Sequence, residues 1–284
     1  MSEIVLHLAV SGLYGGLALY FWRTRWHFRS PAPAAAGIAG WERLALLVPL
    51  ALHSWLLYAH VIEPDTLRFG FGYALSIALW LAVAIYWIES LFYSLEGMLP
   101  LVLPLAALAV PLPALFPGIS SGNAASPEFR LHMVLAMLAY SVFTIAMLHA
   151  LLMALAERAL HRSRKAQRGA TDALLAGPLA GLPPLLTLER LLFRLIGLAF
   201  VLLTLTLATG ALFSESLFGR AFRFDHKTVF ALLSWLTFAA LLIGRHAYGW
   251  RGRTALRFTL AGFVMLLLAY VGSRFVLEVV LGRS

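Results

Sequence analysis

Residues 190–213 read RLLFRLIGLAFVLLTLTLATGALF, and this stretch decides the fold class. Its arginines lie near its start, and the residues that follow them are apolar, glycine or threonine. A helix crosses the hydrocarbon core of a bilayer with about 20 such residues. Comparable stretches lie at about 4–22, 42–61, 71–93, 97–116, 131–156, 227–246 and 256–279. The sequence therefore predicts an all-α polytopic integral membrane bundle of about eight transmembrane helices.

The composition supports a membrane protein and excludes several other classes. Of the 284 residues, 61% are hydrophobic and only 12% are charged, which is too little charge to cover a soluble surface. The net charge of +9 fits the basic cytoplasmic loops of a membrane protein, and no soluble basic domain indicates nucleic-acid binding. Because cysteine is absent, disulfides, thiolate metal ligands and c-type haem attachment within this chain are excluded.

The distribution of arginine predicts the orientation. The segments 23–29 (RTRWHFR), 157–168 (ERALHRSRKAQR) and 249–257 (GWRGRTALR) are densely basic and alternate correctly for one face, which we expect to be cytoplasmic. Both termini are then extracytoplasmic. We expect residues 1–284 to form a single membrane domain, with four spans in 1–116 and four more in 131–284. The prolines at 100, 104, 111 and 113 predict that the fourth span is the least regular.

The connection FGRAFRFDHK, residues 218–227, lies on the predicted outer face. The rings of Phe218, Phe222 and Phe224 offer apolar stacking surface. Arg220 and Arg223 oppose the positive-inside trend, which indicates an anionic partner on this side. Lipid headgroups are the alternative partner, because arginine side chains near helix ends extend toward the membrane interface.

Several histidines are candidate metal ligands. His132 and His226 open two spans at the same predicted depth, so their imidazoles could hold a haem iron between them, with Asp225 orienting one ring. His53 lies inside the second span, where an ionisable group indicates a functional site. The alternative for His53 is a hydrogen bond between helices. Arg274 and Glu278 share one helix face, so Arg274 could bind either that carboxylate or a haem propionate.

These residues resemble a known family. The stretch FGRAFRFDHK follows the frame W-G-x-x-W-x-W-D-P-K-E of cytochrome c assembly and haem-handling membrane proteins, with phenylalanine at each tryptophan position. Residues 131–143, LHMVLAMLAYSVF, resemble the family segment whose histidine is an outer-face haem ligand, which maps to His132. The resemblance covers about 130–278 and is closest to the HemX-like or YpjD-like branch. Haem-synthetase members carry a histidine where this chain has Ile243, and a second outer-face histidine that this chain lacks.

The resemblance implies a function without bond-making catalysis. We expect a multi-pass protein of the bacterial inner membrane that handles non-covalent haem b at the extracytoplasmic face, with 131–284 as the family core. Haem, membrane lipid and a cytochrome c maturation component or other membrane protein are the expected partners. The alternative is a haem-free accessory or regulatory subunit that scaffolds a transporter or a tetrapyrrole-synthesis enzyme.

Overall fold

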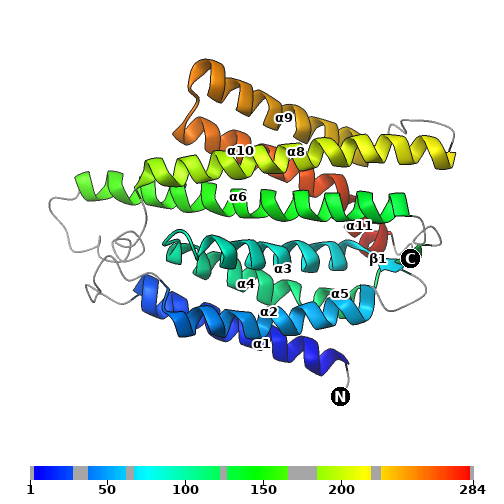
Figure 1. Ribbon diagram of the computed structural model, residues 1–284, viewed down its shortest axis with the longest axis horizontal. Coiled ribbons are helices and arrows are strands. Elements are labelled where there is room, and N and C mark those ends of the chain that lie inside the picture. The colour runs from blue at the N-terminus through cyan, green and yellow to red at the C-terminus, as the bar shows by residue number, and fades with distance from the viewer. Residues whose placement is uncertain are drawn as a thin grey trace.

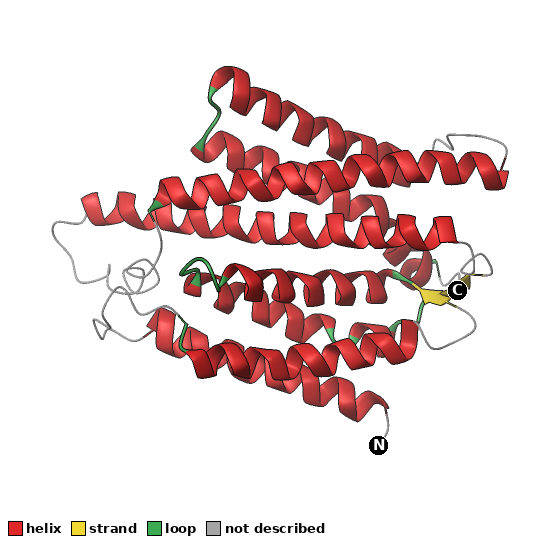
Figure 2. Ribbon diagram, viewed as in Figure 1, coloured by secondary structure: helices red, strands yellow, loops and turns green. Residues whose placement is uncertain are grey.

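The computed structural model describes residues 3–27, 38–61, 67–121, 127–165, 184–218 and 225–281. They form a bundle of long, roughly aligned helices (Figures 1 and 2). In chain order the elements are α1 Glu3–Phe21, the π-helical turn η1 Trp22–His27, α2 Gly40–Val61, β1 Leu67–Phe69, α3 Phe71–Glu89, η2 Glu96–Met98, α4 Leu99–Ala109, α5 Leu112–Leu115, β2 Ile119–Ser121, α6 Pro127–Lys165, α8 Leu185–Phe218, α9 His226–Tyr248, α10 Gly252–Leu267, η4 Leu268–Gly272, α11 Ser273–Phe275 and η5 Val276–Val280.

The predicted helical membrane fold is confirmed. Among the described residues, seven helices are long and apolar enough to cross a membrane. The remaining expected span is α2, whose 22 residues measure about 33 Å at about 1.5 Å per residue. The fourth span is irregular, as its prolines predict: η2, α4 and α5 share it, and Pro111 separates α4 from α5.

Two features differ from the sequence-based expectation. Strands β1 and β2 pair antiparallel at one end of the bundle, with Leu67 opposite Ser121, where only loops were expected. Helices α6 and α8 extend beyond the predicted apolar runs, and α8 includes Phe218. A helix continues past the hydrocarbon core wherever its residues favour helical backbone, so hydropathy alone underestimates its length.

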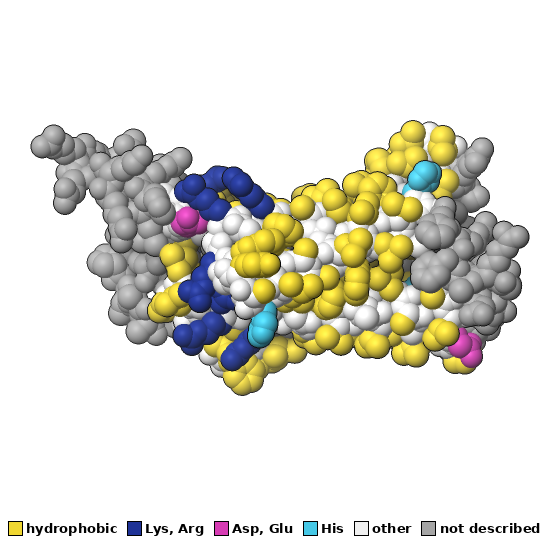
Figure 3. Space-filling model, turned by 90° about the horizontal axis from the view of Figure 1, so that it is seen from above, with side chains coloured by type: hydrophobic (Ala, Val, Ile, Leu, Met, Phe, Trp, Pro, Cys, Tyr) yellow, Lys and Arg dark blue, Asp and Glu magenta, His cyan; other side chains and the backbone are white. Residues whose placement is uncertain are grey.

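The bundle has two chemically different ends and an apolar middle. Helix α1 begins, η5 ends and β1 lies at one end, so both termini are on the same side (Figure 1). Lysine and arginine side chains gather at the opposite end, where α9 ends and α10 begins (Figure 3). Large apolar side chains are exposed along the sides of the bundle, including Leu8, Leu108, Val201, Leu236 and Val264. Lipid contact accounts for this exposure, because a bilayer core is as apolar as these side chains.

Helices α3 and α6 join two hydrophobic cores. One core packs α1, α2, α3 and α4 against α6 and the first part of α8, and the other packs α3, α6, α8, α9 and α10 together. Phe143 on α6 and Phe238 on α9 stack at 4.0 Å between ring centroids. The hydroxyl of Tyr140 donates to the Leu266 carbonyl at 2.5 Å, and this bond fixes α6 against the end of α10.

Gly72, in the first turn of α3, provides a test of the close approach of α3 to α5. A Cβ atom there would lie 2.8 Å from the Leu112 carbonyl oxygen and 3.1 Å from that of Phe116. Because both are backbone atoms, Gly72→Ala should reduce the free energy of unfolding by about 1–3 kcal/mol. Gly197→Ala is the control, since nothing lies within 4 Å of its Cβ position in α8. Thermal unfolding in detergent measures both, and equal stability of the two variants would contradict the packing described.

Candidate functional site

His132 lies near the beginning of α6, at the end of the bundle where both termini lie. Its ring is half-buried against α8, and its Nδ1 lies 3.1 Å from Oγ1 of Thr209. Gly210 makes room for the ring: a Cβ atom there would lie 3.1 Å from His132 Cε1. The imidazole predicted as a haem ligand is therefore held on one side by α8.

The hydrogen bonds of Thr209 favour one tautomer of His132. The Thr209 hydroxyl lies 2.8 Å from the Leu205 carbonyl and 3.1 Å from the Thr206 carbonyl, so its single hydrogen is donated to the α8 backbone. Because the Leu205 carbonyl is the nearest acceptor, we assign the hydroxyl hydrogen to it, so that the hydroxyl oxygen accepts from His132 and the ring hydrogen lies on Nδ1. Nε2 is left unprotonated in the neutral ring. This is the form that binds a metal, with the other ring nitrogen anchored by a second residue.

His226 is the first residue of α9 and its side chain is exposed. The preceding Asp225 is the N-cap, and its Oδ1 accepts from the backbone N–H and the hydroxyl of Thr228, both at 2.9 Å. Asp225, predicted to orient a haem ligand, thus also caps the N-terminus of α9, the helix that carries His226. Helix α8 packs against both α6 and α9. No described contact joins His132 to His226.

His53, on α2, is buried where α2 meets α1 and α3. Its Nε2 lies 2.8 Å from Oγ of Ser76 on α3, and its ring meets Tyr14 of α1 edge-on at 5.9 Å. This bond to a neighbouring helix is the alternative that the sequence left open for His53. No described contact brings His53 to His132.

His7 is a buried histidine that the sequence analysis missed. Its Nδ1 lies 2.8 Å from the Val110 carbonyl, at the break between α4 and α5, and the ring interacts electrostatically with His53. The signal was present, because His7 is an ionisable residue inside an apolar run, as His53 is.

The structure does not test the contacts predicted for the side chains of residues 218–224. Arg220, Phe222, Arg223 and Phe224 lie outside the described residues, and only the backbone of Phe218 is described, as the last residue of α8. The predicted stacking and anion binding by these side chains remain predictions.

Arg274 lies in a mixed cluster of charges at the same end as His132. Its guanidinium lies 5.9 Å from the Tyr270 ring centroid, and Arg274 and Lys227 both interact electrostatically with Glu278. The Glu278 carboxylate lies against the beginning of α3, since a Cβ on Gly70 would come within 2.8 Å of it. A carboxylate is favoured at a helix N-terminus. Among the described residues, no hydrogen-bond acceptor reaches the buried Nε of Arg274.

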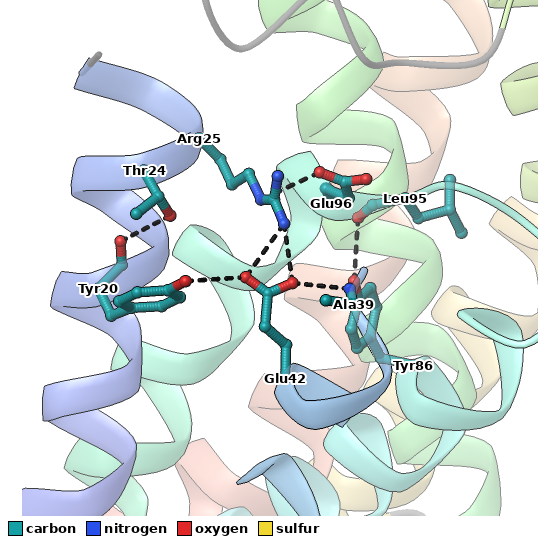
Figure 4. A network of polar contacts seen from close by, with 8 residues as sticks. All are labelled: Tyr20, Thr24, Arg25, Ala39, Glu42, Tyr86, Leu95 and Glu96. Atoms are coloured by element: carbon teal, nitrogen blue, oxygen red, sulfur yellow. Dashed lines mark hydrogen bonds and ion pairs between the residues drawn. The ribbon is translucent and has the colours of Figure 1, made fainter. Parts of the chain in front are cut away.

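At the opposite end, Arg25 joins two buried carboxylates (Figure 4). Its Nη2 lies 2.8 Å from Oε2 of Glu42, and its Nε lies 3.0 Å from Oε2 of Glu96. Glu42 also accepts from the Tyr20 hydroxyl at 3.0 Å and from the Ala39 backbone N–H at 2.8 Å. This network ties η1, α2 and η2 together, and the sequence analysis did not predict it.

In the part of the chain that the structure describes, no three His, Asp or Glu side chains form a group that could hold a metal ion. Haem needs fewer protein ligands, because its porphyrin supplies four nitrogens and the protein supplies one or two axial groups. A single histidine with an unprotonated Nε2, such as His132, fits that requirement.

Sequence comparison identifies the family. Residues 41–281 match the cytochrome C assembly protein family. The chain belongs to this family. The match begins before the second predicted span, so it includes most of the N-terminal half as well as the region 130–278 that carries the resemblance.

Relatives within the cytochrome c assembly family support the YpjD-like branch. The inner membrane protein YpjD of Escherichia coli is 29% identical over 248 residues, which covers 85% of this chain and 89% of YpjD. An uncharacterized 28.8 kDa protein of Azospirillum brasilense is 33% identical over 223 residues, which covers 73% of this chain and 76% of that protein. The cytochrome c biogenesis protein CcsA of Trichormus variabilis is 38% identical over 86 residues, only 24% of CcsA. No solved structure matches this chain.

Family membership and the helices together establish a multi-pass protein of the inner membrane. One departure from the haem-synthetase pattern can now be placed on the fold. Ile243, which the resemblance matches to a histidine of those members, lies on α9 with 64% of its surface exposed. That side chain faces outward from the bundle and belongs to neither hydrophobic core.

Proposed function

We propose that this member of the cytochrome c assembly family binds b-type haem at the end of the bundle where α6 begins and α9 begins, without catalysing bond formation. The observation that carries the proposal is the Thr209–His132 contact at Nδ1, which orients the half-buried ring and leaves Nε2 as the nitrogen for a metal in the assigned tautomer. An imidazole in this state supplies an axial ligand to haem iron.

The cationic side chains at this end of the bundle match the anionic propionates of haem. Haem carries two propionates, and the side chains of Arg274 and Lys227 lie here, with Arg274 holding a buried N–H donor that has no described acceptor. Arg220 and Arg223 belong to the adjacent connection. The gathering of arginines at the opposite end supports assigning this end to the extracytoplasmic face, because basic residues favour the cytoplasmic side. The biogenesis role in the name of CcsA supports haem delivery or storage as the task.

An absorption spectrum of the purified protein tests the proposal. Protein produced with added haem should show a Soret band, with reduced-state bands typical of low-spin b-type haem. Cytoplasmic membranes that lack the protein provide the background. Homogeneous protein without Soret absorbance after haem supplementation would overturn the proposal.

The second axial ligand should be His226, because the His53 ring is buried against Tyr14 with its Nε2 bonded to Ser76, whereas His226 is exposed at the beginning of α9. His226→Ala should therefore convert the six-coordinate spectrum into a five-coordinate, high-spin one. His53→Ala should leave the axial spectrum unchanged. The opposite pattern would assign the ligand to His53.

A haem-free accessory role is the second candidate function. It is favoured by Ile243, an exposed apolar residue where haem-synthetase members carry a histidine. Such a subunit should co-purify with one stoichiometric membrane partner and remain colourless.

A further inference from the structure

A buried pair of ionisable groups connects the two cores, far from His132 along α6. Glu89 is the last residue of α3, and His149 lies in the interior of α6. Nε2 of His149 is 3.7 Å from Oε2 of Glu89, and the His149 side chain is completely buried. Both atoms are buried, and neither has a hydrogen-bond partner among the described residues.

The His149 ring is oriented by its own helix. Nδ1 lies 3.0 Å from the carbonyl oxygen of Ile145, which can only accept, so Nδ1 carries the ring hydrogen. In the neutral ring, Nε2 then carries no hydrogen, and its lone pair faces a carboxylate oxygen of Glu89. Two acceptors that face each other in a buried site repel unless a positive charge or a proton lies between them.

The number of protons follows from the cost of burying charge. Without a proton, the pair is a buried carboxylate opposite a lone pair, and with two it contains an imidazolium beside a neutral acid. An uncompensated charge inside a membrane is expensive in either case. With one proton the pair is neutral overall. The form without charge separation has the proton on Glu89, donated toward Nε2 of His149.

Neighbouring charges do not replace this proton. Titratable or charged side chains that the surrounding elements bring to this end of the bundle include Tyr86 on α3, Arg43 on α2, Glu96 on η2, Glu189 and Arg194 on α8, and Arg253 on α10. Tyr86 donates to the Leu95 carbonyl, and Arg43 donates to the Ser90 carbonyl. Glu96 pairs with Arg25, Glu189 with Arg245 and Arg253 with Glu157. The Arg194 guanidinium lies 3.5 Å from the Tyr93 hydroxyl.

We propose that Glu89 and His149 form a proton-binding dyad that holds one exchangeable proton between α3 and α6 inside the membrane. Exchange with water occurs through Glu89, whose side chain is 13% exposed at the end of α3, because His149 is completely enclosed. This site is independent of haem, so the dyad and the proposed haem site can be tested separately on the same protein.

Infrared spectroscopy of the full-length protein in detergent tests the dyad. The wild type should show the carbonyl stretch of a protonated carboxylic acid near neutral pH, and this band should shift when H₂O is replaced by D₂O. Glu89→Gln should remove the band and still fold, because the amide can donate to Nε2 of His149 without a titratable proton. His149→Leu should shift the band, because the acceptor of the acid proton is gone.

Glu157→Gln is the matched control, since Glu157 is a partly exposed carboxylate paired with Arg253 at 3.5 Å. Its spectrum should retain the band. A wild-type spectrum identical to that of Glu89→Gln, or an unshifted band in folded His149→Leu, would overturn the proposal. A stoichiometric metal ion that Glu89→Gln loses would also overturn it, since a cation would then occupy the place of the proton. If His149→Leu does not fold, the Glu89→Gln comparison decides alone.

Discussion

Replacing His132 by alanine should remove most of the haem that co-purifies with the protein while leaving its expression unchanged. His132 supplies the proposed iron ligand, and its neutral ring is set by Thr209 for coordination through Nε2. The side chain is only half-buried at a helix end, so its loss should affect folding little. The ratio of Soret to protein absorbance in purified samples measures the effect.

Two variants separate loss of the ligand from general damage. Thr209→Val keeps the histidine but removes the acceptor that orients it, so it should weaken haem binding by about 10–100-fold while keeping the same type of spectrum. His246→Ala changes an exposed histidine at the opposite end of the bundle and should have no effect. If His132→Ala retains the wild-type haem content, His132 is not the ligand.

Replacing Arg25 by methionine should cost about 3–5 kcal/mol of unfolding free energy. The arginine lies between Glu42 and Glu96, whose side chains are only 4% and 11% exposed. Without it, two buried carboxylates face each other with no cation. Removing one partner of a buried pair is costly because the other charge remains desolvated. Thermal or denaturant-induced unfolding in detergent measures the loss.

The matched control is Arg253→Met at the same end of the bundle. Its side chain is 72% exposed and lies 3.5 Å from Glu157, so the change should stay within about 1 kcal/mol. Adding Glu42→Gln to Arg25→Met should recover part of the lost stability, since it removes one of the two unpaired carboxylates. Equal effects of Arg25→Met and Arg253→Met would show that the network of Figure 4 contributes no more than a surface pair.

Much of the architecture could be predicted from local composition. The apolar stretch at 190–213 became part of α8, and the prolines of the fourth span interrupt it where they occur. A chain in lipid must satisfy its backbone hydrogen bonds within each segment, so a long apolar run has helix as its only single-segment solution. The dense arginine segments likewise predicted that both termini lie at one end, and the structure places them there (Figure 1).

The candidate site was predictable only in part. His132 was identified from its position and its resemblance to a family ligand, but its partner Thr209 was not. A hydrogen bond from His53 to a neighbouring helix was one of two open alternatives, but its partner Ser76 was not predicted, and His7 was overlooked. Each of these contacts depends on which side of a helix faces its neighbour. An apolar run shows no clear stripe to reveal that, because lipid and protein core both accept the same side chains.

Residue types and their order along the chain therefore determined the existence and order of the membrane helices and the family of this protein. Tertiary structure decided the rotation of each helix about its axis, and with it the tautomer of His132, the Arg25 network and the meeting of Glu89 with His149. The physical reason is that a helix forms through bonds within one segment, whereas these pairs form between segments. Their geometry is set by packing in the two cores that α3 and α6 share.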